Sequence, residues 1–278
     1  MRMRPPTGEI GRLLSEWPSE AAAAAVGAAG VLDAAGPTDR VWPWASVTKL
    51  LTALAVLVAA EEGTLDLDGP AGPPGSTIRH LLAHASGLAP DGDAVLAAPG
   101  ARRIYSNAGY EALGEALSRA AGMGFADYLR AAVVEPLGLT ATTFDGSPAS
   151  GARGPVADLA RLAGELIAPT LVSPATWATA TSVAFPRLDG VLPGYGVQRP
   201  NDWGLGPELR ASKAPHWTGF GNSPATFGHF GRSGSFVWVD PDAGVALVEL
   251  SAEPWGEWTR QRWPQLSDAV VERYRLRR

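Results

Sequence analysis

The sequence predicts a mixed α/β (α+β) fold in which an antiparallel sheet, built from both ends of the chain, is flanked by helices and receives an inserted helical lobe. Three observations predict it. Helical patterns dominate the middle of the 278-residue chain. Two β-rich runs, 235–240 and 245–250, flank the tight turn Pro241-Asp-Ala-Gly. The alanine-rich segment 21–34 is punctuated by glycines and is interpreted as two short strands.

The helices are predicted from apolar periodicity and from end signals. Residues 49–62 lack glycine and proline, are apolar on nearly every face and stop at Gly63, a pattern typical of a buried helix. We expect a single domain, with an α/β lobe from about 1–47 and 183–278 and a helical lobe from about 48–182. The other helices are expected at 9–17, 76–85, 106–121, 125–134, 173–181 and 263–276.

Composition excludes several classes of protein. The chain is 46% hydrophobic and 18% charged with a net charge of −5, which favours a globular protein and argues against nucleic-acid binding. No cysteine is present, so thiol catalysis and thiolate metal sites are excluded. His80 and His84 have the spacing of a helical metal pair, but no acidic residue between or close after them completes a zinc-protease motif. We therefore expect no metal and no cofactor.

The sequence also predicts where the protein acts. Prolines and glutamates interrupt the first 20 residues, so no contiguous apolar core of a signal peptide precedes the alanine-rich segment. The apolar stretch 50–60 is too short to cross a bilayer. We expect a cytoplasmic protein without a membrane span, whose partner is a small-molecule substrate. The oligomeric state is not predicted.

Ser46-Val-Thr-Lys49 is the first motif that carries chemistry. Spacing of three at the start of a helix places both side chains on one face, within hydrogen-bond reach. A serine hydroxyl needs a base, and a lysine serves as one when burial lowers its pKa. Arginine makes up 21 of the 23 basic residues, so a lysine retained here points to a role that arginine cannot fill. The other lysine, Lys213, lies in a loop-like run and is expected to be solvated.

Two further motifs gain meaning beside the first. In Tyr105-Ser-Asn107, a tyrosine near a lysine can hold a depressed pKa and relay a proton to a leaving group, and an asparagine amide can orient a lysine or a substrate carbonyl. Ser106 alone is equally well explained as a helix cap. In His229-Phe-Gly231, glycine lets a strand edge approach a ligand and present backbone N–H groups, although a core histidine beside a bulge explains the tripeptide in isolation.

Together, in this order, the motifs resemble the three signatures of the serine β-lactamase and penicillin-binding-protein superfamily, with its class C β-lactamase, D-amino-acid peptidase and family VIII esterase branch the most similar. The resemblance covers about residues 40–250. The segments that carry it are Ser46-Val-Thr-Lys-Leu-Leu-Thr, Ile78-Arg-His-Leu-Leu-Ala-His-Ala-Ser-Gly-Leu88, Pro99-Gly, Tyr105-Ser-Asn-Ala-Gly-Tyr110, Glu135-Pro-Leu-Gly-Leu139, Phe227-Gly-His-Phe-Gly and Trp238-Val-Asp-Pro241.

The resemblance implies a β-lactamase/transpeptidase-like domain and a role for each motif residue. Ser46 would be acylated, Lys49 and Tyr105 would share the proton transfers, and Asn107 would orient the reacting groups. The oxyanion hole would consist of the backbone N–H groups of Ser46 and Arg232, the residue after Gly231.

The third motif departs from the family pattern. His229 stands where many β-lactamases and transpeptidases carry lysine, and Phe230 stands where they carry threonine or serine. These changes favour a serine hydrolase or acyltransferase acting on a small ester, thioester or amide. A D,D-peptidase or β-lactamase is one alternative, and a catalytically inactive scaffold or sensor is another. Trp203, Trp217 and Trp238 either line the acyl pocket or pack in the core.

Overall fold

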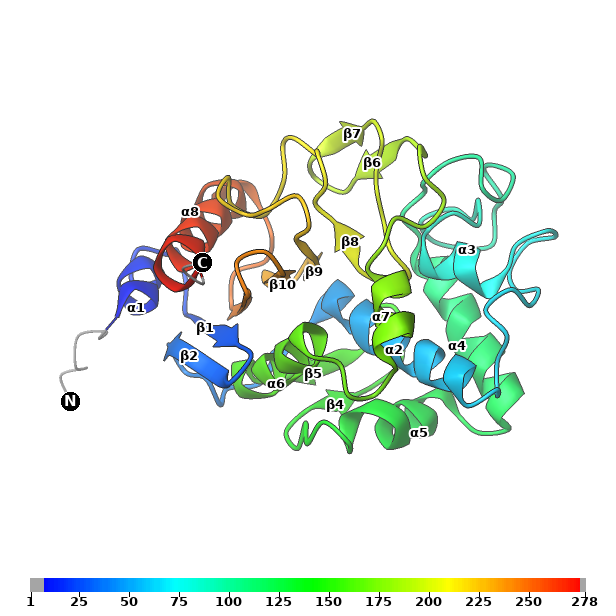
Figure 1. The fold of residues 1–278 in the computed structure, drawn as a ribbon, viewed down its shortest axis with the longest axis horizontal. Coiled ribbons are helices and arrows are strands. Elements are labelled where there is room, and N and C mark those ends of the chain that lie inside the picture. Colours follow the sequence, from blue (N-terminus) through cyan, green and yellow to red (C-terminus); the bar gives the residue numbers. More distant parts are fainter. Residues whose placement is uncertain (1–7, 276–278) are drawn as a thin grey trace.

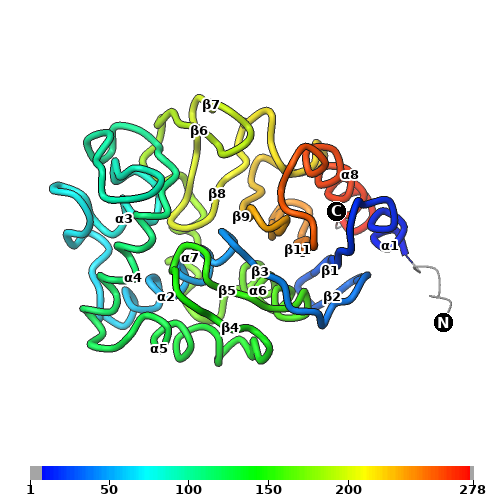
Figure 2. Tube along the Cα trace, turned by 180° about the vertical axis from the view of Figure 1, so that it is seen from behind, coloured from blue at the N-terminus to red at the C-terminus, as the bar shows by residue number. Residues whose placement is uncertain are grey.

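The computed structural model describes residues 8–275 and contains a six-stranded antiparallel sheet with helices on both faces (Figures 1 and 2). The predicted fold class is therefore confirmed. Both ends of the chain supply the sheet, as expected. Its order is β2 (Gly30–Ala35), β1 (Ala21–Gly27), β11 (Val245–Ser251), β10 (Ser235–Asp240), β9 (Phe227–Gly231) and β8 (Glu208–Leu209).

The alanine-rich segment forms an inner strand of this sheet. β1 pairs with β11 along its whole length, from Ala21 opposite Ser251 to Gly27 opposite Val245, and every β1 residue is buried. Successive side chains of a strand point to opposite faces, so alternate alanines enter two different cores. Small side chains in the middle of the sheet allow helices to pack closely on both faces.

The two cores lie on opposite faces of the sheet. One core contains the apolar residues of α2 (Thr48–Glu61), α4 (Asn107–Ala121) and α6 (Val156–Ile167). The other contains those of α1 (Glu9–Leu14) and α8 (Glu257–Tyr274), which lie together at one end of the molecule (Figure 1). Helix α2 is buried at 11 of its 14 residues, as its uniformly apolar sequence predicts.

Short elements complete the structure. They are α3 (Ile78–Leu82), α5 (Phe125–Leu129), the π-helical turn Arg130–Val134, α7 (Pro174–Ala180), a small sheet of β3 (Trp42–Pro43), β5 (Ala152–Gly154) and β4 (Thr143–Phe144), and the hairpin β6 (Gly190–Leu192) and β7 (Gly196–Gln198). Strand β3 of the small sheet leads directly into the turn that precedes α2.

Three helices differ most from the sequence prediction. Helix α6 was not predicted, and it lies against the main sheet although it belongs to the central helical segment. Helix α8 begins at Glu257 rather than at 263. Helix α3 is shorter than 76–85 because Thr77 caps its start and His84 adopts a left-handed φ of 54° after its end. The division of the chain into two lobes stays a proposal.

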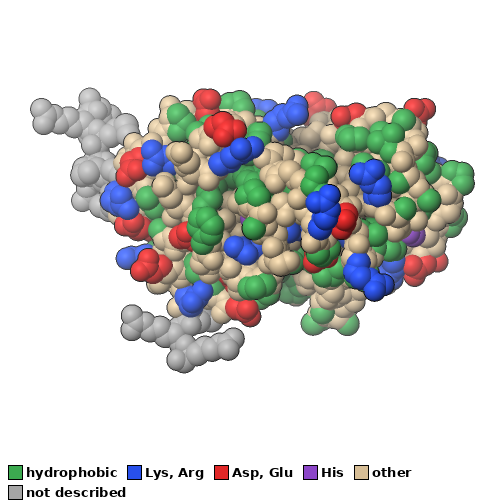
Figure 3. Space-filling model, turned by 90° about the horizontal axis from the view of Figure 1, so that it is seen from above, with side chains coloured by type: hydrophobic (Ala, Val, Ile, Leu, Met, Phe, Trp, Pro, Cys, Tyr) green, Lys and Arg blue, Asp and Glu red, His purple; other side chains and the backbone are tan. Residues whose placement is uncertain are grey.

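Among residues 8–275, no helix is long and apolar enough to cross a membrane. On the face shown in Figure 3, acidic and basic side chains are interspersed with apolar ones, without a patch of one charge. This mixed surface agrees with the small net charge of −5.

Candidate active site

Ser46 lies in a short 3-10 helix (Ala45–Val47) that continues directly into α2. Its side chain is partly exposed, whereas Trp44 and Val47 beside it are buried. Ala45 has a φ of 45°, a left-handed conformation that costs a non-glycine residue about 1 kcal/mol or more. The Trp44 indole donates to the carbonyl of Gly154 at 3.1 Å and anchors this turn to β5. A buried frame thus holds an accessible hydroxyl at the start of a helix.

Lys49 is completely buried one helical turn after Ser46. Its Nζ donates to Ser46 Oγ at 3.3 Å, to Asn107 Oδ1 at 2.8 Å and to the Ala149 carbonyl at 3.0 Å. Burial lowers the pKa of Lys49 to about 7, although the charges of Glu111 and Asp91 act in the opposite direction. A large fraction of this lysine is therefore neutral at physiological pH and able to accept a proton.

Tyr105 lies over the lysine, with its ring centre 4.8 Å from Lys49 Nζ. The expectation of a depressed pKa for Tyr105 was wrong: burial raises it above its usual value near 10, although a hydrogen bond with Ser46 acts in the opposite direction. The phenol therefore keeps its proton at neutral pH. Of the two groups beside Ser46, Lys49 is the one whose pKa suits a base, and Tyr105 suits a proton donor.

Asn107 is the first residue of α4, after the N-cap Ser106. The Ser106 hydroxyl accepts from the backbone N–H of Gly109 at 2.9 Å, so it caps the helix as its residue type predicts. The amide of Asn107 bridges two groups: Oδ1 accepts from Lys49, and Nδ2 donates to Asp91 Oδ1 at 3.0 Å. These partners fix the orientation of the amide, and Asp91 was not predicted from the sequence.

Strand β9 brings His229 and Gly231 to the site. His229 is buried, and its Nδ1–H donates to the carbonyl of Phe230 at 2.8 Å. Burial, assisted by the charge of Lys49, lowers the pKa of His229 to about 3, so the ring is neutral. The His229 ring centre lies 5.9 Å from that of Tyr105. The third motif thus contributes an uncharged wall to the site.

Gly231 ends β9 against the turn that carries Ser46. A Cβ atom at this position would lie 2.6 Å from the Trp44 carbonyl oxygen and 3.0 Å from Ala45 Cβ. Only glycine allows this approach without a shift of the backbone. Arg232 follows in the turn, where its carbonyl accepts from the N–H of Trp255 at 2.9 Å. The strand end and the serine turn are therefore in direct contact.

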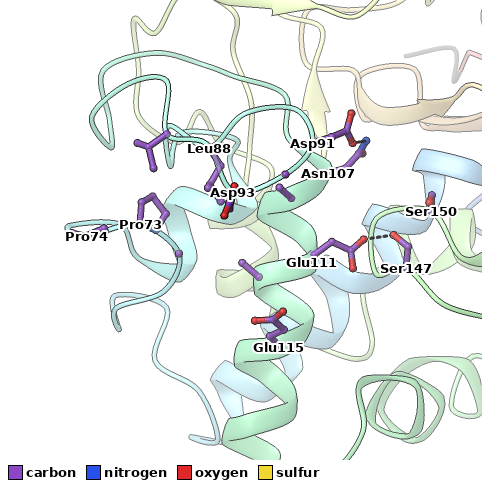
Figure 4. A pocket seen from close by; sticks show the side chains of 15 residues that line it. Pro73, Pro74, Leu88, Asp91, Asp93, Asn107, Glu111, Glu115, Ser147 and Ser150 are labelled. Carbon is purple, nitrogen blue, oxygen red and sulfur yellow. Dashed lines mark hydrogen bonds between the residues drawn. The ribbon is translucent and has the colours of Figure 1, made fainter.

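A cavity of about 870 Å³ adjoins the site, and Asn107 and Asp91 form part of its lining (Figure 4). It lies between the start of α4 and the loops around residues 73 and 92. The Ser147 hydroxyl donates to Glu111 at one wall, and Asp91 points toward Asn107 at another (Figure 4). Its lining includes the carboxylates Asp91, Asp93, Glu111 and Glu115 and the apolar residues Pro73, Pro74, Leu88, Val95, Ala108 and Ala112.

The prediction for Lys213 was wrong. Its side chain is buried, its Nζ binds the carboxylate of Glu208, and it donates to the Asp202 carbonyl at 2.6 Å. Glu208 also accepts from His216 and from the indole of Trp217. The loop after β8 therefore folds over a buried charged pair that a local sequence pattern did not reveal.

The three tryptophans have different surroundings, although all are buried. Trp203 lies beside Tyr105, with ring centres 6.0 Å apart, and borders the site. Trp217 packs against Phe230 behind the strand. Trp238 donates to Ser267 Oγ on α8 at 3.0 Å and belongs to the second core. Core packing thus accounts for Trp217 and Trp238.

A comparison with protein families matches residues 18–270 of the chain to the Beta-lactamase family. Among curated relatives, a D-alanyl-D-alanine-carboxypeptidase/endopeptidase of Escherichia coli is 29% identical over 147 residues, and penicillin-binding protein 4* of Bacillus subtilis is 30% identical over 139 residues. These matches cover 40% and 38% of the chain and only 38% and 31% of the two relatives.

Solved structures extend the similarity to nearly the whole chain. A beta-lactamase from Mycobacterium bovis is 57% identical, with a TM-score of 0.95, and the match covers 96% of this chain and 100% of the other. A mutant simvastatin synthase from Aspergillus terreus shares the fold, with a TM-score of 0.80 at 20% identity over 92% and 91% of the two chains. The hydrolase EstCE1 shares it with a TM-score of 0.77 at 19% identity over 94% and 97%. The chain belongs to the beta-lactamase family of serine hydrolases.

Proposed function

We propose that the protein is a serine hydrolase or acyltransferase that forms an acyl-Ser46 intermediate from a small ester, thioester or amide. One observation carries the proposal: Lys49 Nζ lies 3.3 Å from Ser46 Oγ, in surroundings that lower the lysine pKa to about 7. A neutral lysine at this distance can accept the serine proton as the hydroxyl attacks.

The proposed first half-reaction moves one proton and exchanges one bond. Lys49 takes the proton of Ser46 while Oγ bonds to the substrate carbonyl carbon, whose π electrons move onto the carbonyl oxygen. The backbone N–H groups of Ser46 and Arg232 are proposed to bind that oxyanion, and losing one such donor typically costs about 2.7–4 kcal/mol in the barrier. Collapse breaks the bond to the leaving group, which takes the proton held by Lys49 either directly or through Tyr105, which then regains a proton from Lys49.

In the second half-reaction, water or another acceptor gives a proton to Lys49 as its oxygen or other nucleophilic atom bonds to the carbonyl carbon. The bond from that carbon to Ser46 Oγ then breaks, and Oγ regains its proton from Lys49. Asn107 is proposed to hold Lys49, since its Oδ1 accepts from Nζ at 2.8 Å. Neutral His229 is proposed to border the acyl group, whereas Phe230 packs on the α8 side of the sheet. Neither residue offers a cation for a substrate carboxylate, which supports esters and amides over β-lactams.

A second candidate is D,D-peptidase or β-lactamase action. The E. coli and B. subtilis relatives favour it, because their names describe a D-alanyl-D-alanine-carboxypeptidase/endopeptidase and a penicillin-binding protein. The M. bovis structure, described as a beta-lactamase, favours it as well. The third candidate, a catalytically inactive scaffold or sensor, requires that Ser46 stay unacylated.

One panel of substrates separates the three candidates. Purified protein is incubated with p-nitrophenyl esters, acyl thioesters, nitrocefin and a peptide ending in D-Ala-D-Ala, with Ser46→Ala as the control. The proposal expects ester turnover by the wild type only, together with a mass increase on the peptide that contains Ser46. Equal rates in both proteins, with no adduct, would support the scaffold. Nitrocefin or peptide turnover above ester turnover would support the second candidate. The cytoplasmic location stays part of the proposal, and cell fractionation tests it.

A further inference from the structure

His84 makes three contacts with Tyr105 and the residues on either side of it. Its backbone carbonyl accepts from the N–H of Ile104 at 2.9 Å, and its ring Nδ1 accepts from the N–H of Ser106 at 3.1 Å. The same ring packs on the ring of Tyr105, with centres 4.6 Å apart. One residue therefore holds the backbone on both sides of Tyr105 and also contacts its side chain.

His84 has an uncommon backbone conformation. The residue is 1% exposed and adopts a left-handed φ of 54°, which few residues other than glycine take, although asparagine, aspartate and histidine take it more often than the rest. Such backbone strain persists only where surrounding contacts determine it. The far side of the ring meets Tyr110 and Trp203, with centres 5.2 and 5.0 Å away. Contacts with three aromatic rings therefore fix the position of the His84 ring.

The hydrogen bonds determine the protonation of the ring. A backbone N–H can only donate, so Nδ1 must carry a lone pair and the ring proton must lie on Nε2. Nε2 is buried without a hydrogen-bond partner among residues 8–275. Burial, and then the charge of Lys49, holds the pKa of His84 well below its usual value. A charged ring would carry a proton on Nδ1 and could not accept from the Ser106 N–H. The low pKa and the observed hydrogen bond therefore both indicate a neutral ring.

We propose that His84 is a positioning residue that fixes Tyr105 over Ser46 and Lys49 through its bonds to Ile104 and Ser106. The inference rests on the proposed acyl-Ser46 chemistry. Because Ser106 is also the N-cap of α4, the bond from its N–H to His84 holds the residue that precedes Asn107 at the start of that helix.

His80, four residues before His84, has different contacts. Its ring accepts from the N–H of Thr77 and stacks on Phe185, with centres 4.2 Å apart. Neither contact reaches Tyr105, so His80 serves as a matched control for a substitution at His84.

The test compares three substitutions that separate the acceptor from the ring. In His84→Asn, Oδ1 occupies nearly the place of Nδ1, and asparagine tolerates the left-handed backbone. In His84→Gln the acceptor lies one methylene farther out, and in His84→Leu it is lost. We expect His84→Asn to keep kcat within about threefold of the wild type. We expect His84→Gln and His84→Leu to lower kcat by about ten- to a hundredfold with KM within about twofold.

The pH dependence distinguishes positioning from a charge effect. Because His84 is neutral, the midpoint near pH 7 assigned to Lys49 should be unchanged in all three variants. A shifted midpoint, or equal kcat in His84→Leu and the wild type, would overturn the inference. The control His80→Asn should keep the wild-type kcat. Folding is checked by circular dichroism, and if His84→Leu does not fold, the Asn and Gln pair decides.

A measurement without turnover tests the geometry itself. Ring ¹⁵N shifts of His84 should report a bare Nδ1 and a protonated Nε2 from pH 5 to pH 9. The opposite tautomer, or titration near pH 6.5, would overturn the inference. If the wild type forms no adduct on Ser46, the proposed function fails. If the adduct forms and His84→Leu is fully active, only the positioning role fails.

Discussion

Lys49 combines two properties that rarely occur together in one lysine. It has no exposed surface, yet no carboxylate forms an ion pair with it among the described residues, and its three acceptors are neutral oxygens. Neutral acceptors stabilise a cation less than a carboxylate does. The fully buried ammonium therefore loses its proton more readily, which brings the pKa to about 7.

The rate of Ser46 acylation should follow the titration of Lys49. Below pH 7 the lysine is protonated and cannot accept the serine proton, and above pH 7 it is neutral. The burst rate with a p-nitrophenyl ester should therefore rise with pH about a midpoint near 7 and then reach a plateau. Stopped-flow measurements from pH 5 to pH 9.5 check this. Lys49→Arg, whose guanidinium keeps its charge, should show no burst at any of these pH values. A midpoint above pH 9 in the wild type would exclude Lys49 as the base.

Residue-scale prediction succeeded where the partners lie close in sequence or form part of a motif. Ser46 and Lys49 are one helical turn apart, so their spacing alone predicts contact. The bond from Lys49 to the Ala149 carbonyl has no sequence signal, because any residue type supplies that acceptor. The prediction of a solvated Lys213 failed because the sequence of the strand and loop that bury it shows no regular spacing of apolar residues.

The end of β9 must lie close to the serine turn for the proposed oxyanion hole to form. Gly231→Ala places a Cβ where Ser235 Oγ is 2.4 Å and the Trp44 carbonyl 2.6 Å away, so the strand must shift. We expect kcat to fall by about tenfold or more, because small displacements of reacting groups are costly. Steady-state kinetics on the best ester measures the effect.

Gly164 provides the control for this substitution. It lies within α6, and a Cβ there would meet no atom within 4 Å outside the helix. Gly164→Ala should leave kcat unchanged and raise the free energy of unfolding by about 0.5–1 kcal/mol, as expected for an interior helical position. Unchanged kinetics in Gly231→Ala would show that the strand end does not set the geometry of the reaction.

The loop after β8 depends on the buried pair Glu208 and Lys213. Burial alone would raise the pKa of Glu208, but the charges of Lys213 and His216 overcome this effect and hold it below its usual range. Removing one partner of a buried pair leaves an unpaired charge, so Lys213→Met should lower the free energy of unfolding by about 3–5 kcal/mol. Urea denaturation at pH 7 measures the loss.

The double variant Glu208→Gln with Lys213→Met tests the cause of that loss. It leaves no unpaired charge, so it should be more stable than Lys213→Met alone. If the double variant is the less stable of the two, the pair does not account for the stability of the loop. The Lys213 Nζ lies 5.3 Å from the ring centre of Trp203, which borders Tyr105, so kcat is measured in both variants as well.

At the scale of helices and strands, prediction depended on how clearly apolar residues recur at regular spacing within each segment. The β10 and β11 hairpin and helices α2 and α4 have strong patterns and were predicted within a few residues. Helix α6 was missed although Val156, Leu159, Ala163 and Leu166 recur at helical spacing after Pro155, so the sequence did contain its signal. Strands of two or three residues such as β3 and β8 carry too few positions for any period to appear.

At the scale of the whole molecule, the site lies where the two cores meet. Ser46 and Lys49 belong to the α2 side of the sheet, whereas Phe230, between His229 and Gly231, packs on the α8 side. Strand β9 therefore links the packing of both cores to the position of the serine turn. The sequence predicts each half from its own motif, but their meeting depends on the sheet order, which no local pattern encodes.

Glu249 makes the stability of the whole fold depend on pH. It lies on β11 opposite Phe236, is completely buried, and neither carboxyl oxygen has a hydrogen-bond partner among residues 8–275. Burial raises the pKa of Glu249 well above its usual value, while Trp263 and Ser251 act in the opposite direction. The folded state therefore keeps a proton that the unfolded state releases above about pH 4. Stability from this group is full below about pH 4 and declines as pH rises toward the folded-state pKa.

Glu249→Gln should remove this dependence, because the amide is neutral at every pH. We expect the variant to match the wild type at pH 5 within about 1 kcal/mol and to exceed it by about 1–3 kcal/mol at pH 8, measured by urea unfolding at both pH values. Glu165→Gln is the matched control: its buried carboxylate accepts from two N–H groups and one hydroxyl. That variant should be destabilised at both pH values. Equal stability of Glu249→Gln and the wild type at pH 8 would mean that this carboxyl ionises at no cost, and that hydration reaches the interior between the sheet and α8.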